Sequence, residues 1–134
     1  MKSNKTNNNY TPKILKSAPV TLADGTNSYT VAISYPKDLF LKIKKIAYNE
    51  DANFSEVLFK CIDNHQNKFR ITSEKHNIPR GNKTSPKSVR FRESQVEYIE
   101  KVCEIKNIKN FTHGVFNILF DYFDIQPEKT EERD

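Results

Sequence analysis

Apolar and polar residues follow the same order twice along this chain. From Tyr29 to Tyr35 they alternate, and the apolar positions are Tyr29, Val31, Ile33 and Tyr35. Alternation of this kind predicts a strand that is buried on one face only. Pro36 follows, and a proline there ends the strand and suits the first position of a helix. We therefore expect a short strand that leads directly into a helix.

Two helices are predicted after this strand. The first has an apolar face at helical spacing, made by Leu39, Phe40, Ile43, Ile46 and Ala47. A polar turn at residues 49–53 separates it from the second helix. Ser55 is expected to be the N-cap of that second helix, which ends near His65.

The second copy of the pattern begins with another alternating strand, from Lys87 to Arg92. Val89 and Phe91 occupy one face, and the other face carries Ser88, Arg90 and Arg92. The polar face of this strand therefore has two arginines. The first strand has only the short side chains of Thr30, Ala32 and Ser34 on its polar face.

Two helices follow in the second copy as well. Ser94 and Glu97 have the spacing of a capping box for the first of them. Thr112 is expected to cap the last helix, in a turn that reads Asn110-Phe111-Thr112 where the first copy reads Asn53-Phe54-Ser55. A repeated unit of this size needs a partner to bury its apolar face, and here the partner can be the other half of the chain.

These patterns divide the 134 residues into five segments. Residues 1–27 are expected to be a flexible arm, and residues 125–134 a charged tail. Between them, residues 28–66 and residues 86–124 are the two repeated units, joined by a linker over residues 67–85. Each unit is too small to hold a core of its own, so we expect the two to form one domain.

Composition excludes several classes of protein. Cys61 and Cys103 lie in apolar stretches, which is typical of small buried side chains, and no spacing of Cys and His suits zinc. We therefore expect no metal, no cofactor and no disulfide, and a cytoplasmic location. We expect no signal peptide, because the lysines of the N-terminal segment are not followed by a continuous apolar stretch, and no membrane contact, because no apolar stretch is long enough to span a bilayer.

The positive charge is concentrated in one part of the chain. The formal net charge is +5 and the pI is about 9.1, which weakly indicates an anionic partner. Residues 68–92 contain eight Lys or Arg and a single acid, Glu74. The basic excess thus lies on the second strand and on the segment that leads to it.

The arrangement resembles the ribbon-helix-helix family of DNA-binding proteins, of the Arc and MetJ type. The first copy matches through residues 30–36, Leu39, Ile43 and residues 55–58, and the second through residues 89–94, Val96, Ile99, Val102 and Thr112. The resemblance implies an α+β, mainly α, fold in which a two-stranded antiparallel ribbon lies over four helices with pseudo-twofold symmetry. Two tandem copies in one chain are similar to accessory proteins of plasmid-transfer complexes.

The resemblance also implies where DNA binds, because a two-stranded ribbon fits the major groove. Base-reading residues would then be Arg90, Arg92, Ser88, Thr30, Ala32 and Ser34. Arginine is the side chain best suited to guanine, so the second strand would carry most of the readout. The competing interpretation is that both arginines are solubilising charges on an exposed strand.

Phosphate contacts are predicted beside the ribbon, because the first N–H groups of a helix are a ready anion site. The candidates are Lys87, Asn53, Ser55, Asn110, Thr112 and His113. The same residues also have an ordinary structural interpretation, since Ser55 and Thr112 are expected caps.

The function predicted from the sequence is sequence-specific binding of double-stranded DNA. The protein would act as a transcriptional regulator or as an accessory factor in plasmid transfer or partition, with a second DNA-bound protein as a further partner. The resemblance implies a bacterial, phage or plasmid origin. One chain could be a complete pseudo-dimer, or two chains could form a homodimer.

Two other functions remain open at this point. The chain could be a protein-interaction module, such as an antitoxin or adaptor, with only generic affinity for nucleic acid. It could also bind single strands, although the alternation places Tyr29, Tyr35 and Phe91 on the core face. An enzyme is not expected, because the sequence has no phosphate-binding glycine loop with its lysine, no HExxH and no GxSxG.

Overall fold

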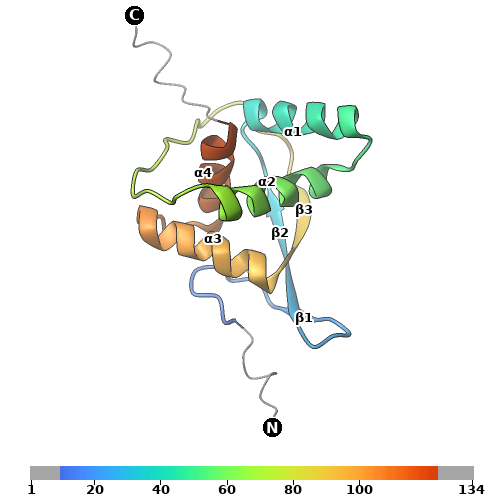
Figure 1. The fold of residues 1–134 in the computed structure, drawn as a ribbon, viewed down its shortest axis with the longest axis vertical. Coiled ribbons are helices and arrows are strands. Elements are labelled where there is room, and N and C mark those ends of the chain that lie inside the picture. The colour runs from blue at the N-terminus through green and yellow to red at the C-terminus, as the bar shows by residue number, and fades with distance from the viewer. Residues whose placement is uncertain (1–9, 124–134) are drawn as a thin grey trace, which may run out of the picture.

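The protein has an α+β fold that is mainly helical. A computed structural model describes residues 10–123, and in these residues four helices pack against a three-stranded antiparallel sheet of order β1-β2-β3 (Figure 1). The elements are β1 (Val20–Thr21), β2 (Asn27–Ile33), α1 (Lys37–Glu50), α2 (Phe54–Lys68), β3 (Lys87–Arg92), α3 (Glu93–Lys106) and α4 (Phe111–Phe123).

The two long strands come from the two halves of the chain and pair directly. β2 and β3 are antiparallel over six residue pairs, among them Tyr29 with Phe91 and Thr30 with Arg90. Residues that are directly opposite project from the same face of the sheet. Tyr29 and Phe91 are almost fully buried, whereas Thr30 and Arg90 are exposed. The alternation predicted for both strands is confirmed.

The buried face of the sheet is covered by the helices, and the core is continuous between the two halves. In Figure 1 all four helices lie on one side of the β2–β3 pair. Phe91 of β3 contacts Phe59 of α2, with ring centroids 5.8 Å apart, and Phe111 of α4, with centroids 5.5 Å apart. Tyr35 contacts Phe116 of α4 at 6.0 Å between centroids. One strand therefore packs against helices of both halves.

Each half has a tight turn between its two helices. The first helix ends at a residue in the left-handed region, Asp51 with φ 54° and Asn107 with φ 60°. An asparagine then caps the second helix: Asn53 Oδ1 accepts the backbone N–H of Glu56 at 2.9 Å, and Asn110 Oδ1 accepts that of His113 at 3.0 Å. The two turns are thus built in the same way.

These caps correct the sequence prediction of helix starts. Ser55 and Thr112 are not N-caps but lie one position inside α2 and α4, since Phe54 and Phe111 are already helical. The side-chain oxygen of an asparagine accepts the third N–H of a helix as well as a hydroxyl does. The N-caps are therefore Asn53 and Asn110, two residues before the predicted ones. The capping box expected at Ser94 and Glu97 is also wrong.

Helix α3 begins immediately after β3. Its first residue is Glu93, and the backbone N–H of Arg92 donates to Oε1 of Gln95 at 2.8 Å. The side chain three positions into the helix therefore reaches back to the last residue of the strand. This bond connects the end of the sheet to the start of the helix and leaves no coil between them.

The N-terminal segment also differs from the prediction. Residues 10–27, expected to belong to a flexible arm, have a defined path along α3 and β2. The buried carboxylate of Glu100 accepts the backbone N–H groups of Lys13, Ile14 and Leu15 at 2.7–2.9 Å. Strand β1 then pairs with Asn27 and Ser28 at the start of β2. Residues 1–9 and the predicted tail at 125–134 lie outside the described residues.

The two cysteines are buried, as predicted. Cys61 and Cys103 are free thiols on α2 and α3 with about 2% of their surface exposed. Burial raises the pKa of both thiols to about 12, so they remain protonated at neutral pH. Among the helices of residues 10–123, none combines the length and the apolar character needed to cross a bilayer.

Candidate nucleic-acid interface

The exposed face of the β2–β3 pair brings together residues from both halves of the chain. Arg90 lies opposite Thr30 and Ser88 lies opposite Ala32, so these four side chains share the exposed face. Arg92 belongs to the same face and lies opposite Ser28, which is buried beside β1.

Ser34, the sixth of the predicted base-reading residues, is not part of this face. Strand β2 ends at Ile33, and the last pair of the ladder is Ile33 with Lys87. Ser34 therefore lies beyond the ladder, where it is partly buried. The remaining five residues, Thr30, Ala32, Ser88, Arg90 and Arg92, are exposed together.

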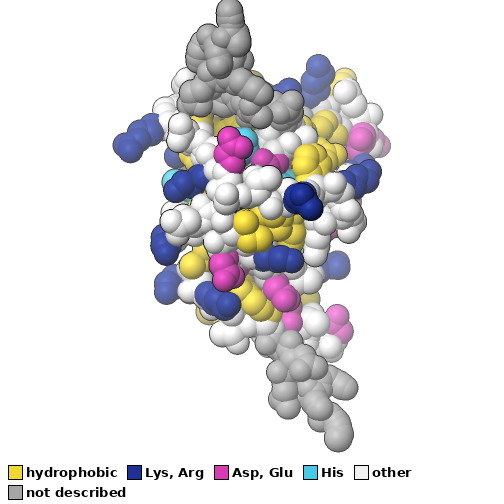
Figure 2. Space-filling view, turned by 60° about the vertical axis from the view of Figure 1, so that its left-hand side comes forward, with side chains coloured by type: hydrophobic (Ala, Val, Ile, Leu, Met, Phe, Trp, Pro, Cys, Tyr) yellow, Lys and Arg dark blue, Asp and Glu magenta, His cyan; other side chains and the backbone are white. Residues whose placement is uncertain are grey.

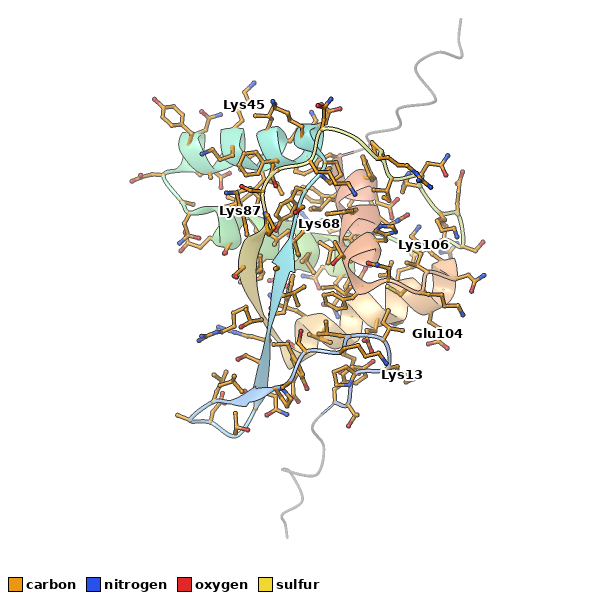
Figure 3. All side chains as sticks on the ribbon, turned by 180° about the vertical axis from the view of Figure 1, so that it is seen from behind. Lys13, Lys45, Lys68, Lys87, Glu104 and Lys106 are labelled. Carbon is orange, nitrogen blue, oxygen red and sulfur yellow. The ribbon has the colours of Figure 1, made fainter. Side chains whose placement is uncertain are left out.

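Lys87 projects from the other side of the sheet. It is paired with the buried Ile33, and its Nζ lies 5.3 Å from the centroid of the Phe40 ring (Figure 3). A cation over an aromatic face is held by the ring quadrupole. The ammonium group is exposed at the end of the strand, so it can meet an anion beside the sheet but not on the exposed face.

The two arginines have different surroundings. Arg90 is the third of the six pairs from the Arg92 end of the ladder, and its neighbours across the strand are short side chains. Arg92 lies at the end of the ladder, in a hollow that is also lined by Asp24, Glu93 and Glu97. Hydrogen bonds from Thr26, with a smaller contribution from the Arg92 guanidinium, hold the pKa of Asp24 below its usual range. Arg92 therefore has acidic neighbours, whereas Arg90 has only short side chains across the strand.

The starts of α2 and α4 are alike in geometry and unlike in charge. At α2, Asn53 and Glu56 form a reciprocal pair in which Glu56 Oε1 accepts the backbone N–H of Asn53 at 3.0 Å. Ser55 lies in this first turn, beside that carboxylate. At α4 the residue equivalent to Glu56 is His113, and residues 111–114 contain no acid. The Glu56 carboxylate therefore repels an anion at the start of α2, and the start of α4 has no such acid.

The segment that joins the two halves adds positive charge at α4, which the sequence prediction missed. A hollow of about 530 Å³ lies between residues 75–83 and the start of α4. The charged or titratable side chains that line it are Lys75, His76, Arg80, Lys83 and His113, and the described residues around it include no Asp or Glu. We call this feature the basic hollow. An adjoining depression shares Lys75, His76 and His113 and adds Lys109 and Asn110.

The electrostatics of His113 agree with this picture. Its ring is partly buried, and burial followed by the nearby Lys83 ammonium lowers its pKa below the usual value. Both causes disfavour a further positive charge at this position. The basic hollow is therefore a place of positive potential without a compensating carboxylate in its lining.

A network of polar side chains around Asp121 holds the connecting segment against α4. Asp121 of α4 accepts hydrogen bonds from His65 Nε2 at 2.9 Å and from His76 Nε2 at 2.6 Å, and it lies 3.6 Å from the ammonium of Lys106. His65 also contacts the hydroxyl of Tyr98 at 2.5 Å. Although burial alone would raise it, these partners hold the pKa of Asp121 well below its usual range. The network joins α2, α3, α4 and the connecting segment.

The role of this network is structural. The side chains of His65 and Lys106 are completely buried, so neither is accessible to a substrate. Lys106 donates to the backbone carbonyl of Glu74 at 2.6 Å, which fixes the connecting segment to α3 (Figure 3). Within residues 10–123, no group of three or more His, Cys, Asp or Glu side chains is arranged to hold a metal ion.

Other parts of the surface do not show one dominant sign of charge. On the face that Figure 2 brings forward, which carries α3, acidic and basic side chains are interspersed with apolar ones. The hollow beneath residues 10–14 is lined by Glu97, Glu100 and Glu104 as well as by lysines. Positive charge is therefore gathered at the exposed strand and in the basic hollow, and also along α1, where Lys37, Lys42, Lys44 and Lys45 are exposed.

Comparison with protein-family models, with curated proteins and with solved structures gives no match. The site therefore has to be interpreted from its own geometry. It offers a narrow polar ridge with an available arginine, and a basic hollow on α4. Both features suit a partner with regularly placed negative charges and exposed hydrogen-bonding groups.

Proposed function

We propose that this protein binds double-stranded DNA in a sequence-specific way, with the β2–β3 pair inserted in the major groove. The proposal treats the chain as two tandem ribbon-helix-helix units that pair within one molecule. The observation that carries it is the pairing of β2 with β3 across the two halves, with one face buried on helices and the other presenting Arg90.

The width of the exposed ridge supports this proposal. Two paired strands lie about 5 Å apart, and the major groove of B-DNA is about 12 Å wide. Strand β1 pairs only with Asn27 and Ser28, so the ladder is two strands wide at the level of Thr30 and Arg90, where the hydroxyl of Ser17 donates to the carbonyl of Thr30 at 3.0 Å along the edge of β2. A two-stranded ridge of this kind can enter the groove with its exposed face toward the base edges.

Within this proposal, affinity and specificity come from different residues. Arg90 reads a base, most favourably guanine, with Ser88, Thr30 and Ala32 as shorter contacts. Arg92 is the second reader, in a hollow that it shares with acidic side chains. Lys87 and the starts of α2 and α4, with Asn53, Ser55, Asn110, Thr112 and His113, are placed for phosphates, and α4 is the more favourable of the two.

The proposed biological role follows from binding and includes no catalytic step. A transcriptional regulator and an accessory factor of plasmid transfer or partition use the same kind of site, and fold alone does not choose between them. The protein would act in the cytoplasm, as a single-chain pseudo-dimer or as a homodimer of such chains.

A second candidate function is supported by the outer side of α1. Leu41 and Tyr48 are seven residues apart on this helix and are 51% and 87% exposed. Residues at this spacing lie on one face of a helix. An interaction module of the antitoxin or adaptor type would use this face, and so would a second DNA-bound protein.

Selection from a random duplex library at near-physiological salt tests the proposed function. Sequencing of the bound fraction should show an enriched motif that is asymmetric, because the two strands of the ridge are unlike. Weak and salt-sensitive binding to every duplex, without enrichment, would contradict specific readout. Equal or tighter binding of unpaired strands would favour a single-strand protein instead.

A further inference from the structure

We propose that the basic hollow binds a backbone phosphate of DNA, so that the segment joining the two repeats is a phosphate clamp on one side of the ridge. The claim that this phosphate belongs to DNA rests on the proposed function. The existence of an anion site rests only on the hollow and its lining.

The connecting segment is held in place at both ends of the hollow. At one end the backbone N–H of His76 donates to Oδ1 of Asn117 at 2.7 Å, and Nε2 of its ring donates to Oδ1 of Asp121 at 2.6 Å. At the other end the carbonyl of Asn82 accepts the N–H of Lys37 at 2.9 Å, and the N–H of Thr84 donates to the carbonyl of Tyr35 at 2.9 Å. The backbone around the hollow is therefore ordered before any ligand arrives.

These attachments position the cations next to them. Lys75 precedes the attached residue His76, and Lys83 lies between the attached residues Asn82 and Thr84. Arg80 lies between the two ends of the segment, and all three line the same hollow. Because the backbone is fixed, an anion that enters the hollow has to order only side chains, which lowers the entropic cost of binding.

The lining is suited to a phosphate rather than to a neutral ligand. Three basic side chains, Lys75, Arg80 and Lys83, are part of its lining, which contains no carboxylate. Arginine can present two parallel N–H groups to phosphate oxygens, and lysine acts as a point charge. Burial, and after it the nearby Lys83 ammonium, lower the pKa of His113, which places Lys83 close to the start of α4.

The clamp is present on one side only. The start of α2, which is the counterpart of the α4 start in the first half, carries the carboxylate of Glu56, and the chain passes from one half to the other only once. A phosphate held in the basic hollow therefore has no equivalent at α2. The region of DNA protected by the protein should extend further on the α4 side.

Two variants with a matched control test this inference. Lys83→Gln and Arg80→Gln each remove one charge from the hollow and leave the backbone attachments in place. Lys45→Gln removes one exposed charge from the outer side of α1 (Figure 3). Affinity is measured for an enriched duplex and for a scrambled duplex over a range of salt concentrations.

The hollow variants should weaken binding of both duplexes by the same factor, roughly fivefold each at near-physiological salt, and lower the salt slope by about one. Lys45→Gln should match the wild-type protein. Unchanged affinity and slope in both hollow variants, with a wild-type protein that binds duplex normally, would overturn the clamp and leave the proposed function in place.

A second readout does not depend on DNA. Inorganic phosphate is added to the protein while the His113 ring is titrated by NMR, with His113→Gln for assignment. Phosphate in the hollow should raise the pKa of His113 in the wild-type protein and raise it less in Lys83→Gln. A pKa of His113 that phosphate leaves unchanged in the wild-type protein would overturn the anion site, whether or not the protein binds duplex.

Discussion

Asn53 and Asn110 hold the same place in the two halves of the chain, yet three positions later the halves differ in charge. Glu56 follows in the first half and His113 in the second. The strands differ in the same direction, because Thr30 on β2 lies opposite Arg90 on β3. At these two equivalent places, the exposed face of the strand and the start of the second helix, the second half is therefore the more basic one.

The interiors of the two halves differ as well. Counting from the capping asparagines, Asn64 of α2 corresponds to Asp121 of α4, and Val57 corresponds to Gly114. Counting from Asp51 and Asn107, the exposed Glu50 corresponds to the buried Lys106. The second half has thus placed a charge pair in its core where the first half has a neutral amide and a surface acid.

The largest effect is expected from this buried charge pair. Asp121→Asn leaves the buried Lys106 without an anion, so it should lower the free energy of unfolding by roughly 3 kcal/mol in urea denaturation at pH 7. The control is Glu50→Gln, which breaks the exposed Glu50–Lys60 pair of 3.0 Å and should cost less than about 1 kcal/mol. Equal losses in both variants would show that the two halves do not differ in this way.

The same carboxylate should make stability depend on pH. The pKa of Asp121 is lowered in the folded protein, so its contribution is complete above the ordinary pKa of an aspartate, about 4, and is lost as the pH falls further through the folded value. Wild-type protein should therefore lose stability progressively as the pH falls below about 5, and Asp121→Asn should lose less. Parallel curves of urea midpoint against pH for the two proteins would contradict this assignment.

The two strands should also differ in how much they contribute to duplex binding, and this effect is smaller. Arg90→Ala should cost roughly 1–3 kcal/mol of binding to an enriched duplex and relax the preference at one base pair. Thr30→Ala removes the side chain directly opposite and should cost clearly less. Binding is measured by titration against duplexes that carry each base at that position. An unchanged preference in Arg90→Ala would exclude β3 as the reading strand.

The next effect is a loss of stability where α3 and α4 pack closely at Gly114. A Cβ at Gly114 would collide with the sulfur of Cys103, so Gly114→Ala should destabilise the protein by about 1–2 kcal/mol in spite of its better helix propensity. Gly81→Ala is the control, because a Cβ there meets no atom within 4 Å. The cost of Cys103→Ala should be smaller in the Gly114→Ala background than alone, and additive costs would contradict the collision.

The smallest effect concerns the start of α2. Glu56→Gln removes the carboxylate but keeps a side chain that can still bond to the N–H of Asn53. Duplex binding should therefore become tighter by roughly 0.3–1 kcal/mol, and the gain should shrink at high salt. Unchanged binding of Glu56→Gln at low salt would mean that α2 is not near phosphate.

Short-range patterns were enough to predict β2, β3, the four helices and their buried faces, but they did not predict β1. The alternation of apolar and polar residues identified which residues of β2 and β3 face the core. Successive side chains of a strand point to opposite faces, so helices that cover one face of the sheet bury every second residue. The exact helix starts were missed because asparagine and hydroxyl side chains cap equally well, and two candidates lay two residues apart.

Contacts between distant residues could not be predicted from the sequence. Nothing near Glu100 indicates that it accepts the N–H groups of residues 13–15, more than 80 positions away. The basic hollow was missed for the same reason. The basic composition of the connecting segment was evident, but its attachment through His76 to Asp121 of α4 depends on the three-dimensional path.

Chemical-shift mapping with an enriched duplex tests the central claim most directly. The account predicts that backbone amide and arginine side-chain signals change most at Ser88, Arg90 and Arg92, less at Thr30 and Ala32, and not on the outer side of α1. Changes concentrated at Leu41 and Tyr48, with Arg90 unaffected, would contradict major-groove binding by the β2–β3 pair and would identify α1 as the interaction surface.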